Sequence, residues 1–124
     1  MRVFKTRAFA RFADREEVDD DALCEAVARA GKGLIDADLG GGVIKQRIAR
    51  KGQGRSGGFR SIVLFRRDRL AFFVYGFAKR DRQNLRPDEL KAYRLLAAEM
   101  LAMDAPRLDA ALRNRTIFEV TCDG

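Results

Sequence analysis

Basic side chains are concentrated in one stretch of the sequence, Val43–Arg82. These forty residues hold twelve Lys or Arg and two acidic residues, a net charge of +10, whereas the remaining 84 residues hold thirteen basic and sixteen acidic residues. Guanidinium and ammonium groups bind phosphate oxygens, so a local field of this size indicates a polyphosphate ligand, most often nucleic acid. A basic surface without function is disfavoured, because like charges packed on one sheet repel each other.

Histidine is absent, which removes the commonest general acid–base catalyst and the commonest metal ligand. Two isolated cysteines, Cys24 and Cys122, cannot complete a zinc site of the usual kind. Catalysis would therefore depend on Lys, Arg, Tyr, Ser, Asp or Glu side chains or on groups of the substrate itself. We expect no metal and no cofactor.

The basic stretch predicts three β-strands, at Val43–Ala49, Phe59–Arg66 and Leu70–Lys79. In the first strand Ile44 and Ile48 point to one face, and Lys45 and Arg47 point to the other. These two cations either solvate an exposed sheet face or bind phosphate. The other two strands are apolar on both faces, which predicts central strands that are covered on both sides.

The residues between the first two strands, Arg50–Gly58, predict a flexible glycine-rich loop with three cations, Arg50, Lys51 and Arg55. The glycine spacing does not match a Walker loop, and the strand-to-helix context of a dinucleotide-binding loop is missing. Backbone N–H groups and guanidinium groups in such a loop could instead lie along a strand of RNA or DNA.

A two-residue turn at Arg67-Asp68 is expected to join the second and third strands into a hairpin. In that register Arg60 lies opposite Tyr75, and both side chains share one face. Arg60 and Lys79 then sit at the end of the hairpin away from the turn. We expect a cleft at this rim of the apolar sheet.

The remaining sequence predicts helices around this sheet. Arg2–Lys5 could form a short first strand, Thr6 can cap a first helix, and the acidic run Asp19–Asp21 suits the start of a second helix, with a metal site as the minor alternative. Leu34–Leu39 is either an edge strand or a loop. Further on, a helix is expected from Pro87 to about residue 104, then a break at Pro106, a last helical turn and a short strand near residues 117–120.

These elements define an α+β class in one domain, residues 1–124: a helical part at 1–33, a sheet at 34–79, a C-terminal helix at about 87–104 and a short tail. The charged N-terminus does not resemble a signal peptide, and no apolar run approaches the length of a membrane span. We therefore expect a cytoplasmic protein without membrane contact. Its cysteines are then expected to be free thiols.

Four segments together resemble the HigB-like branch of the RelE/ParE toxin superfamily: Gly42–Arg47, Lys51–Arg60, Val74–Lys79 and Leu85–Leu90. The resemblance covers roughly residues 40–100. It implies a RelE-like fold, in which helices pack on a small antiparallel β-sheet. It also implies the toxin of a type II toxin–antitoxin module, which in many such proteins is an mRNA interferase, an endoribonuclease that cuts mRNA on the ribosome and inhibits translation.

The resemblance also implies partners. These are a cognate protein antitoxin, with a helix-turn-helix DNA-binding domain, and the mRNA and ribosome. Operator DNA would be bound through the antitoxin complex.

Carried over residue by residue, the resemblance places Arg60 in the catalytic cleft and Lys79 at the end of the next strand. Lys45, Arg47, Lys51 and Arg55 match the family's basic strand and loop only as a cationic group. The expected RNA-binding residues are Lys45, Arg47, Arg50, Arg55 and Arg80. In the mechanism that the residues can support, the RNA 2′-OH is the nucleophile, and Arg60 stabilises charge on the phosphoryl oxygens. Lys79 or Lys51 would act as the base, and Tyr75 would orient the phosphate or stack on a nucleobase.

One departure from the superfamily pattern is visible in the sequence. Some members use a histidine or a C-terminal tyrosine, whereas this sequence has neither a histidine nor a tyrosine after Tyr93. Catalysis therefore depends on lysine and arginine alone, or this member has lost it. A gyrase-inhibiting toxin of the ParE type and a non-catalytic RNA- or ribosome-binding protein remain the alternatives.

Overall fold

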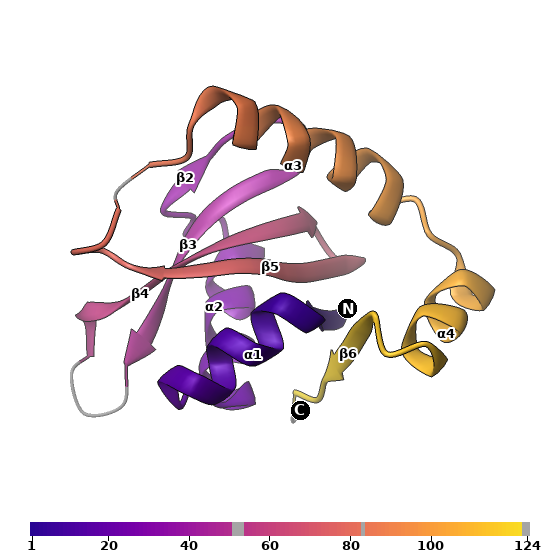
Figure 1. Ribbon diagram of the computed structural model, residues 1–124, viewed down its shortest axis with the longest axis horizontal. Coiled ribbons are helices and arrows are strands. Elements are labelled where there is room, and N and C mark those ends of the chain that lie inside the picture. The colour runs from indigo at the N-terminus through magenta and orange to yellow at the C-terminus, as the bar shows by residue number, and fades with distance from the viewer. Residues whose placement is uncertain (51–53, 83, 123–124) are drawn as a thin grey trace.

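A six-stranded sheet carrying four helices forms the protein, and the computed structural model describes residues 1–50, 54–82 and 84–122 of it (Figure 1). The elements in chain order are β1 (Arg2–Thr6), α1 (Arg7–Glu16), α2 (Asp20–Gly31), β2 (Ala37–Asp38), β3 (Val43–Arg50), β4 (Gly54–Arg66), β5 (Leu70–Ala78), α3 (Pro87–Met100), α4 (Ala105–Arg113) and β6 (Ile117–Val120). The predicted α+β class is confirmed. Within the described ranges, no helix is both long and apolar enough to cross a membrane.

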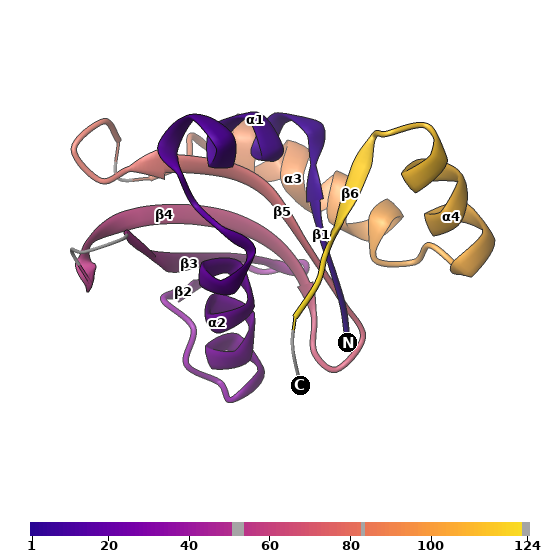
Figure 2. The same cartoon turned by 90° about the horizontal axis from the view of Figure 1, so that it is seen from below.

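The strand order in the sheet is β2-β3-β4-β5-β1-β6. All neighbours are antiparallel except β1 and β5, which run parallel. The first strand of the chain is therefore inserted between β5 and β6, and β1 lies side by side with the last strand, β6 (Figure 2). A parallel pair needs a long crossover, and here the whole segment from α1 to β4 provides it.

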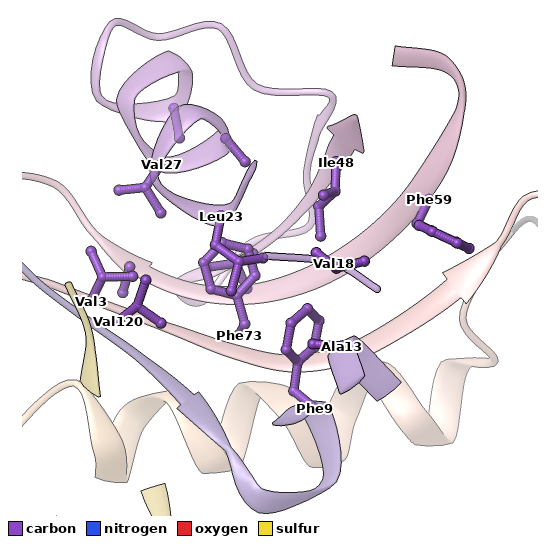
Figure 3. Close-up of a cluster of buried hydrophobic side chains, with 14 of the residues drawn as sticks. Val3, Phe9, Ala13, Val18, Leu23, Val27, Ile48, Phe59, Phe73 and Val120 are labelled. Atoms are coloured by element: carbon purple, nitrogen blue, oxygen red, sulfur yellow. The ribbon is translucent and has the colours of Figure 1, made fainter. Parts of the chain in front are cut away.

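Apolar side chains cover both faces of the sheet, as the predicted central strands require. On one face α1 and α2 pack on the sheet, and Phe9 of α1 meets Phe73 of β5 with ring centroids 5.2 Å apart (Figure 3). On the other face α3 and α4 pack through residues such as Ala97 and Leu108. Full burial of a side chain as large as leucine or phenylalanine stabilises the fold by about 1.5–3 kcal/mol. Packing therefore stabilises the sheet on both faces.

Two predicted helix caps are confirmed. The Thr6 Oγ1 accepts a hydrogen bond from the Phe9 backbone N–H at 3.2 Å, and the Asp19 carboxylate accepts one from the Ala22 backbone N–H at 3.0 Å. Each cap satisfies one of the N–H groups that a helix start leaves unpaired. The acidic run at residues 19–21 is therefore explained by the start of α2.

The glycine-rich loop is shorter than predicted. β3 continues to Arg50 and β4 begins at Gly54, and these two residues form the last pair of the ladder. The prediction of a loop over residues 50–58 is wrong in this respect, because backbone hydrogen bonds between the two strands continue into it. Lys51 lies outside the described residues, as do the side chains of Arg50 and Arg55.

The predicted hairpin register is also wrong. The turn has three residues, Arg67 to Arg69, with Asp68 in the left-handed region at φ 64°, and the register shifts by one residue between Ile62 and Val63. Such a bulge inserts an extra residue into one strand. Arg60 consequently lies opposite Phe77, and Tyr75 lies opposite Ile62.

The C-terminal part differs from prediction at Pro106. α3 ends at Met100, and a second helix of nine residues, α4, begins at Ala105 with Pro106 in its first turn. Proline is tolerated there because the N–H that it lacks has no partner in the first turn. The short strand β6 follows as expected.

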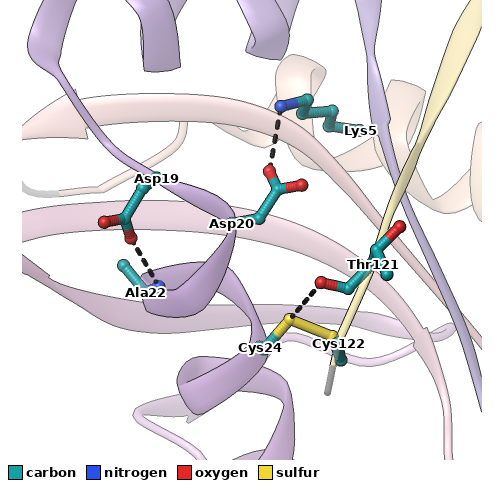
Figure 4. The surroundings of a disulfide bond; sticks show 7 residues. All are labelled: Lys5, Asp19, Asp20, Ala22, Cys24, Thr121 and Cys122. Carbon is teal, nitrogen blue, oxygen red and sulfur yellow. Dashed lines mark hydrogen bonds and ion pairs between the residues drawn. A yellow bond between two sulfur atoms is a disulfide. The ribbon is translucent and has the colours of Figure 1, made fainter.

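The cysteines form a disulfide, so the prediction of free thiols is wrong. Cys24 of α2 and Cys122, which follows β6, have Cα atoms 5.6 Å apart (Figure 4). They meet because β6 is the edge strand beside β1, and α2 packs against that part of the sheet. The Cys24 sulfur also lies 3.7 Å from the Thr121 carbonyl oxygen, a contact only, since a disulfide sulfur carries no proton.

Reduction of this disulfide should destabilise the protein. The bond joins residues 98 positions apart, so it restricts most of the unfolded chain. We expect the free energy of unfolding to fall by about 2–4 kcal/mol when dithiothreitol is present, as measured by urea titration. The double variant Cys24→Ser/Cys122→Ser is the control and should not respond to reductant. Equal stability of the wild type with and without dithiothreitol would contradict the expectation.

Candidate functional site

A cleft of about 220 Å³ lies where β3, β4 and β5 come together at one end of the sheet. Six residues line it: Asp36, Lys45, Arg47, Arg60, Lys79 and Asn84. Four of the six are cations, and all four were singled out from the sequence. The cleft at the rim of the sheet is therefore where the strand pattern predicts it.

Strand geometry explains this convergence. Lys45 and Arg47 alternate with Ile44 and Ile48 along β3, so the two cations share the face opposite the apolar pair. Arg60 of β4 lies directly opposite Arg47 in the ladder. Lys79 is exposed in the turn that follows β5.

Arg60 is the most buried charge of the cleft. Its side chain is only 7% exposed, and its Nε lies 3.6 Å from Oδ2 of Asp36. Its NH1 atom is buried and has no hydrogen-bond partner among the described residues. A buried, unsatisfied donor on a charged group is costly. Arg60 is thus a preformed site for an additional hydrogen-bond acceptor.

Asp36 is the acidic residue of the cleft, and the sequence did not indicate it. Its Oδ1 lies 3.1 Å from Nε of Arg47, and its side chain is 18% exposed. The segment before β2 that carries Asp36 is fixed by Gln46, whose side-chain oxygen accepts the Asp36 backbone N–H at 2.9 Å. No local sequence pattern indicates Asp36, because the two arginines that it contacts lie on β3 and β4, far from it in the sequence.

Gln46 is fully buried on the inward side of β3 and was also missed. Its Nε2 donates to the carbonyl oxygens of Ala26 in α2 and of Leu34, both at 3.0 Å. A polar residue at an inward strand position, between Ile44 and Ile48, was the available signal. Such a residue is retained only when its amide is satisfied inside the protein.

Lys45 donates to the side-chain oxygen of Asn84 at 3.4 Å, so the segment that follows β5 closes one side of the cleft. In the ranges that the structure describes, no three Cys, His, Asp or Glu side chains are grouped to hold a metal. The donor set of the cleft is cationic and suits an anion.

Tyr75 was predicted to lie opposite Arg60, but it lines a second cleft of about 440 Å³. Arg80, which was predicted to bind RNA, lines the same second cleft. This cleft is bounded by Phe12 and Arg15 of α1 and by the end of β5. The three-residue turn and the bulge in the β4–β5 ladder cause the separation together. Each shifts the register by one residue, so Tyr75 lies two residues away from the position opposite Arg60. Arg80 is exposed and lies 3.9 Å from the carboxylate of Asp81.

Arg82 links the segment that carries Asn84 to helix α3. Its guanidinium donates two hydrogen bonds to the carboxylate of Glu89 in α3, one of them at 3.1 Å, and one to the Asn84 carbonyl oxygen at 3.0 Å. The same group lies 5.6 Å from the ring centroid of Tyr75. The hydrogen bonds from Arg82, aided by the Arg86 backbone N–H, lower the pKa of Glu89 to about 2.

Comparison with known proteins gives one family. The model of the family described as the RelE toxin of the RelE/RelB toxin–antitoxin system matches residues 1–120. The match extends well beyond the segments that carry the resemblance, and includes β1, both N-terminal helices and β6. No curated protein matches the chain.

The Arg82–Glu89 pair should make stability depend on pH. The pKa of Glu89 in the folded protein, about 2, is below its ordinary value of 4.5, so the pair stabilises the fold above about pH 4.5 and loses this effect as the pH falls towards 2. Glu89→Gln should therefore destabilise the protein at pH 7, and the difference from the wild type should shrink between pH 4.5 and pH 2 in urea titrations.

Asp88→Asn provides the matched control for this series, because Asp88 is an exposed neighbour that contacts only Arg86 among the described hydrogen bonds. Exposed pairs of this kind contribute little, so its effect should be small. A Glu89→Gln difference of constant size from pH 7 to pH 2 would show that the carboxylate charge is not what Arg82 binds.

Proposed function

The chain belongs to the RelE toxin family and is a toxin of a toxin–antitoxin system, and we propose that it acts as a metal-independent endoribonuclease on mRNA. The family implies a protein antitoxin as its partner. The proposal concerns the chemistry of the toxin and the cleft in which it occurs. Within the superfamily we assign the chain to the HigB-like branch, on the segments that resemble it.

The observation that carries the proposal is the unsatisfied NH1 of Arg60 in a cleft with three other cations. A phosphodiester supplies the missing acceptors, because its two free oxygens bind guanidinium groups through charge-assisted hydrogen bonds. A ligand without a hydrogen-bond acceptor would leave the buried donor unpaired, and a cationic ligand would be repelled by the cations of the cleft. The cleft is therefore best suited to the phosphate of a nucleic acid.

RNA supplies its own nucleophile for the cleavage step. The 2′-oxygen forms a bond to phosphorus, the bond to the 5′-oxygen breaks, and the 2′-proton passes to a base while the departing oxygen gains a proton. Negative charge develops on the phosphoryl oxygens, and Arg60 stabilises it through donors that are already oriented. The products carry a cyclic 2′,3′-phosphate and a 5′-hydroxyl group.

Lys79 is our candidate for the base, since it lines the same cleft as Arg60 and a lysine can serve as a general base. Lys51 remains the second candidate and lies outside the described residues. Lys45 and Arg47 would bind the phosphate backbone in the cleft, with Arg50 and Arg55 on the adjoining strands. Tyr75 and Arg80 would contact a neighbouring nucleotide in the second cleft, where a base can stack.

We further propose that cleavage occurs on the ribosome, which would order the mRNA for a cleft as small as this one. The antitoxin would carry a helix-turn-helix domain and bring the complex to operator DNA. This action requires the cytoplasm, where cysteines are usually kept reduced. Activity should therefore be measured with the Cys24–Cys122 bond both intact and reduced.

Arg60→Ala should lower mRNA cleavage by about 100-fold, as expected when one charge-stabilising donor is removed. The measurement is induced expression in bacterial cells, with and without the antitoxin, followed by mapping of new mRNA 5′ ends. Arg60→Lys keeps a charge but loses the planar donor pair, so it should also cleave slowly. Thermal melts of both variants check that the fold is retained.

Arg113→Ala is the control, because Arg113 is exposed on α4 and does not line the cleft. This variant should arrest growth and cut mRNA like the wild type. Folded Arg60 variants that cut at the wild-type rate would refute the assignment of the cleft. Growth arrest with intact mRNA would indicate gyrase as the target, and absence of arrest would indicate a binding module or a toxin that has lost its activity.

A further inference from the structure

We propose that Asp36 is a positioning residue of the cleft, which fixes Arg60 and Arg47 for phosphate binding and limits how tightly the RNA is held. The inference rests on the proposed function, since it concerns how the same cleft treats its substrate. Asp36 would not touch the RNA. It acts through the two arginines that it contacts.

The first reason is an electrostatic conflict in the sheet. Arg47 and Arg60 occupy directly opposite positions on β3 and β4. Like charges at such positions repel and destabilise a sheet. The Asp36 carboxylate resolves the conflict by sharing its oxygens, with Oδ1 3.1 Å from the Arg47 Nε and Oδ2 3.6 Å from the Arg60 Nε. One carboxylate therefore neutralises part of the charge of both arginines.

The second reason is orientation. Asp36 contacts each arginine at Nε, on the side of the guanidinium group. For Arg60 this leaves NH1, at the far end of the group, without a partner. A phosphate can then bind the end of the guanidinium group while Asp36 keeps the side. A planar group that is held at one edge loses little freedom when the other edge binds.

The third reason is that Asp36 is itself held in place. Its backbone N–H donates to the buried side chain of Gln46, which is fixed in turn by the carbonyl oxygens of Ala26 and Leu34. These hydrogen bonds fix the backbone of Asp36, and so the point from which its carboxylate reaches the two arginines. The position of Arg60 therefore depends on the packing of α2 against β3, through Gln46 and Asp36.

The two effects of Asp36 on catalysis have opposite signs. The carboxylate opposes the binding of an anion because it reduces the positive charge of the cleft. It favours the chemical step because it keeps Arg60 in place. Its removal should therefore strengthen RNA binding and slow cleavage, a combination that simple loss of structure would not produce.

The test compares Asp36→Asn with Asp38→Asn, which adds the same charge to the protein two residues away. Asp38 accepts a hydrogen bond from the Gly40 backbone N–H and does not line the cleft. Binding is measured with a single-stranded oligonucleotide whose 2′-hydroxyl groups are replaced by hydrogen, so that it cannot be cut. Cleavage is measured as kcat and KM for a short mRNA on purified ribosomes.

For Asp36→Asn we expect binding of this oligonucleotide to tighten about fivefold, the size of one charge interaction at contact distance in water, and kcat to fall about 10- to 100-fold, the cost of a misplaced catalytic group. Asp38→Asn should change both by less than about twofold. Asp36→Glu restores the negative charge, but its longer side chain places the carboxylate differently. Binding should therefore return to the wild-type value, while kcat recovers only in part.

A third readout does not depend on RNA. The side-chain Nε–H signal of Arg60 in an NMR spectrum, assigned by its loss in Arg60→Lys, should be a narrow line in the wild type and in Asp38→Asn. It should broaden or shift in Asp36→Asn, where the carboxylate that holds it is gone. This measurement tests the position of Arg60 directly.

An Asp36→Asn protein that binds and cleaves like Asp38→Asn overturns the inference, as does a loss of binding and cleavage together. If the wild type neither binds the oligonucleotide nor cuts mRNA, the proposed function fails, and the Arg60 signal alone decides the positioning role. An unchanged Arg60 signal in Asp36→Asn would then refute that role as well.

Discussion

The functional end of this protein depends on a conflict between two arginines that face each other across neighbouring strands. Arg47 and Arg60 are paired in the β3–β4 ladder, and Arg60 is nearly inaccessible to solvent. Such an arrangement is unfavourable in itself, because like charges repel and a buried cation loses its hydration. It persists because Asp36 is bound to both, and because the surrounding core keeps the strands in register. A phosphate that enters the cleft would relieve what remains of the conflict.

The apolar core supplies the rigidity that this arrangement needs. Helices cover both faces of the sheet, with α1 and α2 on one side and α3 and α4 on the other (Figures 1 and 2). The strands that carry the cations are therefore held in place by packing on both faces. Functional groups on rigid strands, with an exposed turn nearby, follow a general division between scaffold and site. Here Lys79 is in the turn and Arg60 is in the scaffold.

Two links hold other segments of the chain in place, one beside the cleft and one at the end of the chain. The Arg82–Glu89 pair ties the segment after β5 to α3 and so holds Asn84 beside Lys45. The disulfide ties α2 to the end of the chain. Since α2 also carries the carbonyl group that orients Gln46, the order of this helix bears on the cleft through a short chain of hydrogen bonds.

Local features of the protein could be predicted from the sequence alone. Alternation along β3 placed Lys45 and Arg47 on one face, the Thr6 and Asp19 caps marked two helix starts, and the charge distribution located the basic region. Each of these depends on neighbours a few residues apart, where period and propensity act directly. The four cations of the cleft could also be predicted from the sequence, because they lie on, or directly after, three adjacent strands that the sequence pattern indicates.

The remaining features arise from contacts that form only when the chain folds. A three-residue turn and the bulge beside Ile62 each shifted the β4–β5 register by one residue, and together they moved Tyr75 away from the position opposite Arg60. Asp36 entered the cleft from a segment with no pattern of its own. The Cys24–Cys122 bond formed between residues that β6 and α2 bring together across the fold. These features depend on contacts between distant segments, and sequence spacing carries no direct record of such contacts.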